Sequence, residues 1–257
     1  MAHSGIGTRV DGPVGIITIN RPEKHNTLTL AMIERLREVA AELDSDPNIR
    51  AIVVTGAGDK AFSAGGDLRS LLPAALEARS DVLNPDPTAR FFSDVFTPVL
   101  AAIEGICVGG GFEIMLGTDI RVAASNATFA VPETKWGLIA GSGTNVRLPQ
   151  QISWPIAMEL LLTGDTIGAE RAAEIGLINR VVAPGTAVEE AIGIAKRIAD
   201  NGPLAVRTAK EIAVRSRHLE QDFAFEHAMN VRILSSNDAR EGVASFTERR
   251  KADFTGR

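Results

Sequence analysis

The chain has little of several residue types, and these shortages narrow what it can be. Its 257 residues include one cysteine and no tyrosine. The single cysteine, Cys107, leaves no internal disulfide framework and suits a reducing compartment, so we expect a cytoplasmic protein. No run of about 18 apolar residues occurs, which argues against a membrane span.

Basic charge and targeting signals are also scarce. The net charge is −5, so no basic surplus is available to neutralise phosphates, and a general nucleic-acid binder is not expected. The opening segment MAHSGIGTRVDG has neither a basic stretch followed by an apolar core nor the Arg-rich, Ser-rich pattern of a transit peptide. The four histidines lie far apart, and no Cys/His spacing suggests a metal site.

The length is enough for one large domain with a substantial core. Thr29 is predicted to cap a helix that runs to about residue 45. A strand–strand–helix unit then recurs with short turns, which predicts an α/β domain whose units stack as a spiral. From residue 155 onward helical periodicity dominates, which indicates a cap on the core or an oligomerisation arm. The predicted strands are 14–19, 51–55, 61–64, 99–103, 120–123, 128–130 and 178–182.

Two glycine-rich turns carry the first chemical signal. In VGGGFEIMLG, residues 108–117, glycines precede a predicted helix and leave its first N–H groups unpaired. Such a turn can bind phosphate or stabilise an oxyanion, or it can simply permit close packing of strand and helix. AFSAGGDLRSL, residues 61–71, has the same layout, so each turn can supply one N–H to a shared oxygen. Asp67 there is interpreted as a helix N-cap.

Two glutamates lie where such an oxygen would bind. Glu113 is in the first turn after the glycines, and Glu133 follows Pro132 at the end of a predicted strand. Two carboxyls on separate elements around one cleft can share acid–base work. Taken singly, Glu113 also fits a helix-capping role, and Glu133 fits an exposed loop charge.

Other motifs are weaker. GAGDKA, residues 56–61, fits a dinucleotide-binding turn, but no clear helix follows it, and the chain has no tyrosine to serve as the proton donor of a short-chain dehydrogenase. No P-loop occurs, and no G-x-S-x-G elbow surrounds Ser63 or Ser142. Cys107 has no histidine nearby in sequence and is interpreted as a small buried apolar residue.

An ordered set of motifs closely resembles the enoyl-CoA hydratase/isomerase (crotonase) superfamily over about residues 14–254. The resemblance implies a crotonase-like spiral of β-β-α units at 1–195, followed by a helical C-terminal trimerisation region at 196–257. Trimers of this kind often pair into hexamers. The motifs are NRPEKHNTLT, AFSAGGDL, EGICVGGGFEIMLGTDIRVAA, FAVPETKWGLIAGSGTNVRLP, LLLTGDTIGAERAAEIGLINRVV and EGVASFTERRKADF.

The resemblance also implies a reaction. The substrate would be an acyl thioester of coenzyme A, and no metal or redox cofactor would be needed. The N–H groups of Gly66 and Gly110 would hold the thioester oxygen while an enolate forms. As in hydratases, Glu113 and Glu133 would hold and deprotonate water, and Glu133 would protonate C2. An isomerase, or another acyl-CoA lyase or hydrolase, and a non-catalytic acyl-CoA-binding protein remain the alternatives.

The implied coenzyme A contacts are a further set. Ala64 would offer its carbonyl to the adenine, and Arg69 and Lys24 would lie near the phosphates. Phe246 and Arg249 match positions that can reach a neighbouring subunit's ligand. Asp67 and Leu68 complete the predicted set.

The chain also departs from the pattern. It reads IAGSGTN at residues 139–145, where the family's hydratases usually read I-P-G-A-G-G-T, and Thr144 takes a usual glycine position. Trp136 is expected to narrow the acyl pocket. The segment 71–91 is expected to cover the acyl chain, and its NPDP at 84–87 is predicted to be a surface loop. Because of these departures, the sequence does not determine which acyl group the substrate carries.

Overall fold

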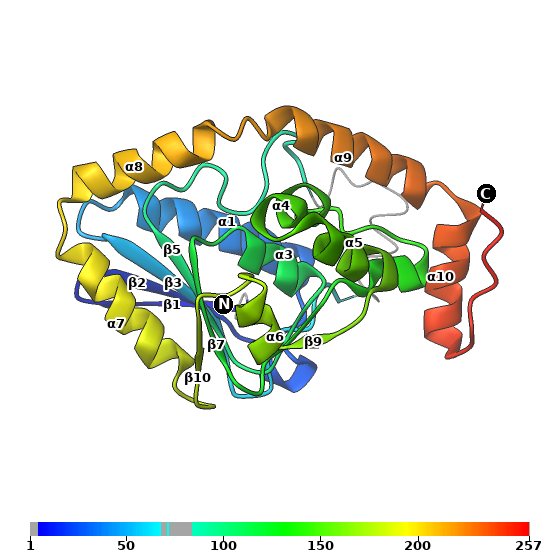
Figure 1. Ribbon diagram of the computed structural model, residues 1–257, viewed down its shortest axis with the longest axis horizontal. Coiled ribbons are helices and arrows are strands. Elements are labelled where there is room, and N and C mark those ends of the chain that lie inside the picture. Colours follow the sequence, from blue (N-terminus) through cyan, green and yellow to red (C-terminus); the bar gives the residue numbers. More distant parts are fainter. Residues whose placement is uncertain (1–4, 68–70, 72–83, 257) are drawn as a thin grey trace.

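The computed structural model describes residues 5–67, 71 and 84–256 (Figure 1). Their strands form two sheets. The larger sheet has the strand order β1-β2-β3-β5-β7-β10. Its first pair, β1–β2, is antiparallel, and its other neighbours are parallel. Its strands are β1 (Ile6–Asp11), β2 (Val14–Ile19), β3 (Ala51–Gly56), β5 (Val99–Ile103), β7 (Ile120–Ala124) and β10 (Arg180–Val182).

The smaller sheet has the order β4-β6-β8-β9. Strands β4, β6 and β8 run parallel, and β9 pairs with β8 in the antiparallel sense. Its strands are β4 (Ala61–Ser63), β6 (Ile106–Val108), β8 (Thr128–Ala130) and β9 (Ile167–Gly168).

Successive chain segments divide their strands between the two sheets. In the pairs β3–β4, β5–β6 and β7–β8, the first strand joins the larger sheet and the second joins the smaller one. The turn from β5 to β6 needs Gly105, which has φ 59°, and a Cβ there would overlap the carbonyl of Lys60. The predicted spiral of β-β-α units is confirmed.

Two apolar layers hold the sheets and helices together. Alternate side chains of the larger sheet meet helix α7 (Ala187–Ala199) on one face, with Val53, Leu100 and Ala191 among the buried contacts. The opposite face packs against helix α1 (Leu30–Ser45), whose buried residues include Leu36. Thr29 caps α1 as predicted, because its side chain accepts a hydrogen bond from the N–H of Met32 at 3.3 Å.

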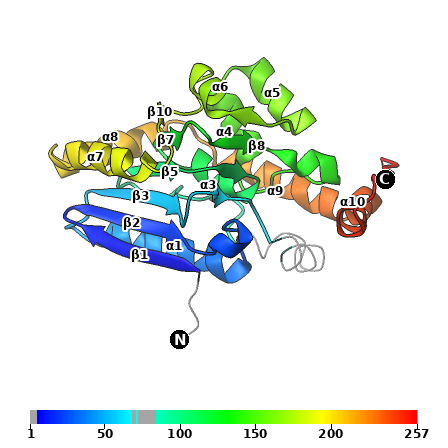
Figure 2. The same ribbon diagram turned by 90° about the horizontal axis from the view of Figure 1, so that it is seen from below.

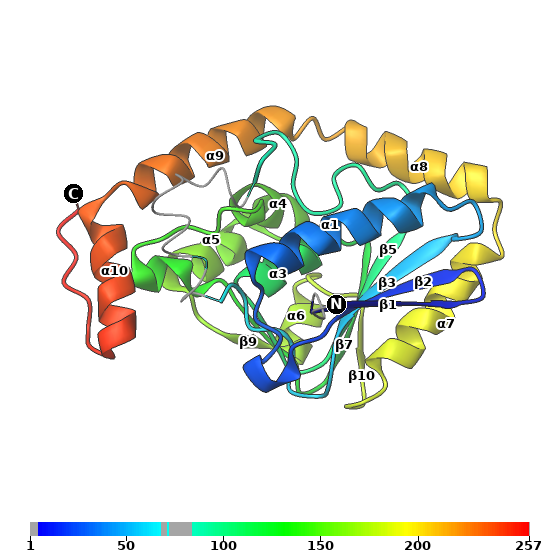
Figure 3. The same ribbon diagram turned by 180° about the vertical axis from the view of Figure 1, so that it is seen from behind.

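Helices dominate after β8. Before β8 the chain also forms the 3-10 helix η1 (Pro22–Lys24) and the helix α3 (Gly110–Leu116). After β8 come the 3-10 helix η2 (Pro132–Trp136) and the helices α4 (Thr144–Gln151), α5 (Trp154–Thr163) and α6 (Ala169–Glu174). The C-terminal helices are α8 (Pro203–Arg215), α9 (Glu220–Leu234) and α10 (Asn237–Glu248). Figure 3 shows α8 and α9 along one edge of the molecule, with α10 turning down at its end. Within the described residues, no helix is both long and apolar enough to span a membrane.

The C-terminal helices extend away from the larger sheet. Figure 2 shows α10 at the far end of the molecule from α7, and α10 contacts η2. The predicted division at residue 195 falls inside α7, which packs on the larger sheet, so α8 is the first helix wholly within the C-terminal region.

Sequence patterns missed several short elements. Strand β1 has a largely exposed pattern without apolar alternation, and β6, which was not among the predicted strands, comes directly before the predicted glycine-rich turn. The NPDP prediction was wrong at its first residue. Asn84 is buried, and its side chain donates a hydrogen bond to the carbonyl of Gly141 at 2.9 Å.

Candidate active site

The two glycine turns meet beside the smaller sheet. The N–H of Leu28 donates to the carbonyl of Gly65, and the N–H of Asp67 donates to the carbonyl of Leu28, both at 2.8 Å. This bridge leaves the N–H of Gly66 unused, and Gly110 begins α3, so its N–H has no helical acceptor. In the described part of the chain neither N–H donates a hydrogen bond. A Cβ on Gly110 would lie 3.5 Å from the nitrogen of Gly66, so the two free amides adjoin.

Close backbone approach explains the glycines in this turn. Gly109 has φ 54°, and a Cβ there would lie 3.1 Å from Oε1 of Glu133. A Cβ on Gly111 would lie 2.5 Å from the carbonyl oxygen of Ser63 on β4. The glycines therefore permit close packing and also bring free N–H groups to one place, while their role in holding an oxyanion stays a prediction.

Glu113 and Glu133 come to this place from different elements. Glu113 lies on α3 and is 8 % exposed, and Glu133 lies in η2 and is half-buried. Oε1 of Glu113 accepts a hydrogen bond from the N–H of Ser142 at 2.7 Å, which fixes that carboxyl. Oε2 of Glu133 is enclosed and has no hydrogen-bond partner among the described residues. One carboxyl is therefore anchored, and the other keeps an oxygen available to a ligand.

The surroundings favour the protonated forms of both carboxyls. Burial raises the pKa of Glu113, and the negative charge of Glu133 raises it further. Burial also raises the pKa of Glu133. Two buried carboxyls that oppose each other's ionisation tend to share a proton at neutral pH. Such a pair presents one acid and one base to the same ligand.

These groups line a small cavity of about 120 Å³. Gly66, Gly110, Glu113 and Glu133 all form part of its wall. Most of the remaining wall is apolar, which suits an acyl chain. The apolar side chains are Leu28, Ile33, Leu71, Phe91, Leu138, Ile139 and Leu234.

A larger cleft of about 700 Å³ adjoins the small cavity. The two hollows share Gly66, Gly110, Glu133 and Leu138. The cleft is open and carries polar and basic groups from η1, so its size and character suit a long polar ligand whose reactive end enters the cavity.

The structure places most of the predicted coenzyme contacts at this cleft. Lys24, Ala64, Asp67 and Phe246 line it. Arg249 is exposed at the end of α10 and does not line it. Leu68 and Arg69 lie outside the described residues. Their roles as coenzyme contacts stay predictions.

Aromatic side chains close one end of the cleft. Trp136 and Phe246 pack edge to face, with ring centroids 4.8 Å apart. Trp136 lines the large cleft and not the small cavity, so the expectation that it narrows the acyl pocket was wrong. The reason is that η2 points Glu133 inward and carries Trp136 on toward α10. Phe246 therefore reaches the cleft of its own chain.

Sequence reasoning missed three residues around this site. Arg21 lines the cleft and pairs with Asp67 at 2.7 Å. Glu226 and Asn230 on α9 are each 4 % exposed, and Asn230 lines the small cavity. A signal existed, since these two polar residues share the buried stripe of α9 with Phe223.

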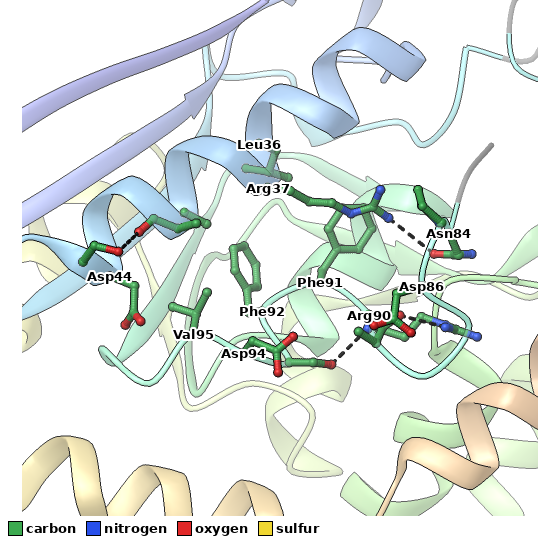
Figure 4. A pocket seen from close by; sticks show the side chains of 16 residues that line it. Leu36, Arg37, Asp44, Asn84, Asp86, Arg90, Phe91, Phe92, Asp94 and Val95 are labelled. Carbon is green, nitrogen blue, oxygen red and sulfur yellow. Dashed lines mark hydrogen bonds between the residues drawn. The ribbon is translucent and has the colours of Figure 1, made fainter. Parts of the chain in front are cut away.

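A separate hollow of about 460 Å³ lies between α1 and residues 84–95. Figure 4 shows Arg37 extending over the ring of Phe91 toward Asn84. The guanidinium carbon of Arg37 lies 5.4 Å from the centre of that ring, and its Nη2 donates to Oδ1 of Asn84 at 3.4 Å. Phe91 borders both this hollow and the small cavity, but neither Glu113 nor Glu133 lines the hollow.

Comparison with known proteins agrees with this geometry. The family model described as enoyl-CoA hydratase/isomerase matches residues 9–257. The chain belongs to the enoyl-CoA hydratase/isomerase family. No group of three His, Cys, Asp or Glu side chains in the described part of this family member is arranged to hold a metal ion.

Individual family members resemble this chain over nearly its whole length. It is 36 % identical to the (E)-benzylidenesuccinyl-CoA hydratase of Thauera aromatica, covering 96 % of this chain and 97 % of the relative. It is 35 % identical to the crotonyl-CoA hydratase of Syntrophomonas wolfei, covering 99 % of each. The crystal structure of carnitinyl-CoA hydratase from Mycobacterium avium superposes with a TM-score of 0.89 at 34 % identity, covering 100 % of both chains.

Proposed function

We propose that this protein is an enoyl-CoA hydratase, which adds water reversibly and in the syn sense across the double bond of a trans-2-enoyl-CoA. The observation that carries the proposal is the meeting of two carboxyls and two free N–H groups in one small cavity. Full-length relatives that are named (E)-benzylidenesuccinyl-CoA hydratase and crotonyl-CoA hydratase support it.

The free N–H groups of Gly66 and Gly110 hold the thioester oxygen. Attack at C3 moves negative charge onto that oxygen, and two preorganised donors stabilise it there. The donors are free before the substrate binds, so no protein hydrogen bond has to break. Loss of one such donor typically raises the barrier by about 3 to 4 kcal/mol.

The carboxyl pair moves the protons. The ionised carboxylate takes a proton from water as its oxygen bonds to C3, and the acid of the pair gives a proton to C2. The pair then holds one proton again, so water is consumed and the protein is unchanged. The free oxygen of Glu133 suits it to donate at C2, while the hydrogen bond from Ser142 holds Glu113 to orient the water.

Two other functions remain to be separated by experiment. A double-bond isomerase needs a carboxyl that moves one proton between two carbons, and Glu133 alone meets that need. The presence of Glu113 in the same cavity favours hydration. Burial opposes the ionisation of both carboxyls, so keeping them in the cavity is unfavourable. Binding of an acyl-CoA without catalysis does not require them.

The proposal also covers the coenzyme, assembly and location. Coenzyme A enters as part of the substrate and lies in the large cleft beside Lys24, Ala64 and Phe246. No metal or redox cofactor takes part in the steps above. The C-terminal helices α8–α10 build a homotrimer or a dimer of trimers, and the protein works in the cytoplasm.

The first test is an assay of the purified protein on crotonyl-CoA and longer trans-2-enoyl-CoAs. Loss of the absorbance of the conjugated thioester reports hydration, and chromatography of the product separates a 3-hydroxyacyl-CoA from a shifted double bond. Rapid formation of the 3-hydroxyacyl-CoA is the expected result. A product with a moved double bond establishes the isomerase instead, and tight binding without any product establishes the non-catalytic reading.

A further inference from the structure

One polar side chain in the small cavity has no part in the chemistry described above. Asn230 lies on α9, is 4 % exposed and lines the cavity together with both carboxyls. Its side chain makes no hydrogen bond to any part of the chain that the structure describes. An amide carries two donors and an acceptor, and a buried one is normally paired. The side chain is therefore poised to bond to whatever fills the cavity.

The amide is also held in place. A Cβ on Gly141 would overlap Nδ2 of Asn230, so the amide packs directly against that glycine. The next residue, Ser142, donates its N–H to Glu113. Asn230 thus lies on the side of the cavity that holds the anchored carboxyl. A fixed polar group at this position discriminates between ligands more sharply than a mobile one does.

The rest of the cavity defines the chemistry that Asn230 can select. The wall around it is largely apolar, and among the described residues the other polar side chains in it are those of Glu113, Glu133 and Ser142. A charged carboxylate on the acyl chain would approach the two glutamates, which already oppose each other's ionisation. A neutral hydroxyl or carbonyl oxygen meets no such repulsion and can pair with the amide.

We propose that Asn230 is a specificity-determining residue, and that the substrate is a short 2-enoyl-CoA carrying a hydroxyl or carbonyl oxygen on the acyl chain beyond C3. The inference rests on the proposed function, because it places the reacting carbons between the two glutamates. The small cavity volume of about 120 Å³ adds the condition that the chain is short.

The experiment compares substrates that differ by one group of equal size. The pairs are 4-hydroxy-trans-2-butenoyl-CoA with trans-2-pentenoyl-CoA, and 5-hydroxy-trans-2-pentenoyl-CoA with trans-2-hexenoyl-CoA. We expect the wild-type kcat/KM to favour the hydroxylated member of at least one pair by about tenfold or more. Asn230→Leu, which keeps the size and removes the amide, should reverse that preference. Gln221→Leu, which removes an exposed amide from the same helix, is the matched control and should preserve it.

Binding measurements keep this inference separate from the proposed reaction. Calorimetry with 4-hydroxybutanoyl-CoA and pentanoyl-CoA tests recognition of the oxygen without any hydration step. Hydration of both substrates with no preference overturns the role of Asn230 and leaves the hydratase intact. A preference in binding without hydration supports Asn230 and overturns the hydratase. If Asn230→Leu lowers kcat/KM equally for both substrates of a pair, the residue is structural and the inference fails.

Discussion

Glu133 is the residue on which the proposed chemistry depends most directly. Glu133→Gln keeps the shape of the side chain and removes the transferable proton, so we expect kcat to fall by about 10² to 10⁴-fold. The affinity for a saturated acyl-CoA should stay within a few fold, because the two N–H donors and the cleft are unchanged. Steady-state kinetics and calorimetry measure the two quantities. Glu189→Gln, an exposed residue on α7, is the control, and near-normal turnover of Glu133→Gln contradicts the assignment.

Single residues also show what the sequence can and cannot predict about the site. Gly66, Gly110, Glu113 and Glu133 were predictable because each lies within a short contiguous motif that has its own local geometry. Asn230 was not, because only the packing of α9 over a cavity formed mostly by residues far earlier in the chain gives it a place in the site. A polar residue on a buried helical stripe indicates such a role, but the pattern does not identify which cavity the residue lines.

At the scale of elements, one buried ion pair joins α9 to residues 84–95. Nε of Arg90 lies 3.1 Å from Oε2 of Glu226, and both side chains are almost completely buried. The same oxygen accepts a hydrogen bond from the N–H of Gly143 at 2.9 Å. The pair therefore also supports the loop that carries Ser142, whose N–H anchors Glu113. Removal of one partner leaves an uncompensated buried charge.

Arg90→Met should lower the free energy of unfolding by about 3 to 5 kcal/mol at pH 8. Burial raises the pKa of Glu226, so protonation relieves the unpaired charge, and the loss should be smaller at pH 5. Urea denaturation at both pH values measures this. The double variant Arg90→Met with Glu226→Gln should recover much of the loss. Equal stability of Arg90→Met and wild type at both pH values would show that the pair contributes nothing.

Elements also differ in how far local sequence determines them. Strand β2 and helix α1 were predicted with their bounds because their apolar periodicity and the Thr29 cap act locally. Strand β6 has three residues, and its existence depends on pairing with β4 and β8, which the sequence around it does not reveal. The helix expected after Gly66 lies largely outside the described residues, so that prediction stands as made.

At the scale of the whole molecule, α8 supports the proposed oligomer. It has no buried residue, and Leu204 and Ile212 are 79 % and 64 % exposed. Exposed apolar side chains grouped on one helix mark a contact surface. We expect the wild type to sediment as a trimer or hexamer of its 27.3 kDa chain, and the Leu204→Glu, Ile212→Glu variant to sediment as a smaller species. Val10→Glu, at an exposed apolar residue of β1, is the control, and an unchanged mass of the α8 variant removes α8 from the interface.

The stability of the whole molecule should depend on the same two carboxyls that serve catalysis. Both have a pKa that burial raises above the unfolded value of 4.5, so the folded protein binds more protons than the unfolded chain above that pH. The free energy of unfolding must then fall as the pH rises from about 5 to 8. In Glu113→Gln with Glu133→Gln this decline should be smaller, which makes the inactive variant more stable than wild type at pH 8 by at least about 1 kcal/mol.

Thermal unfolding at a fixed protein concentration, with Glu189→Gln in parallel, measures this difference. Titratable groups that the variant and the wild type share, including Glu226, contribute equally to the pH dependence of both proteins and cancel in the difference. The melting temperatures should converge as the pH falls to 5 and below, because the glutamates of the wild type become protonated in both states only below the unfolded pKa of 4.5. A difference that is constant from pH 5 to 8 would mean that the carboxyls are not destabilised by burial. A growing difference would show that the molecule retains two carboxyls whose ionisation is opposed by burial, at the place where the proposed reaction needs them.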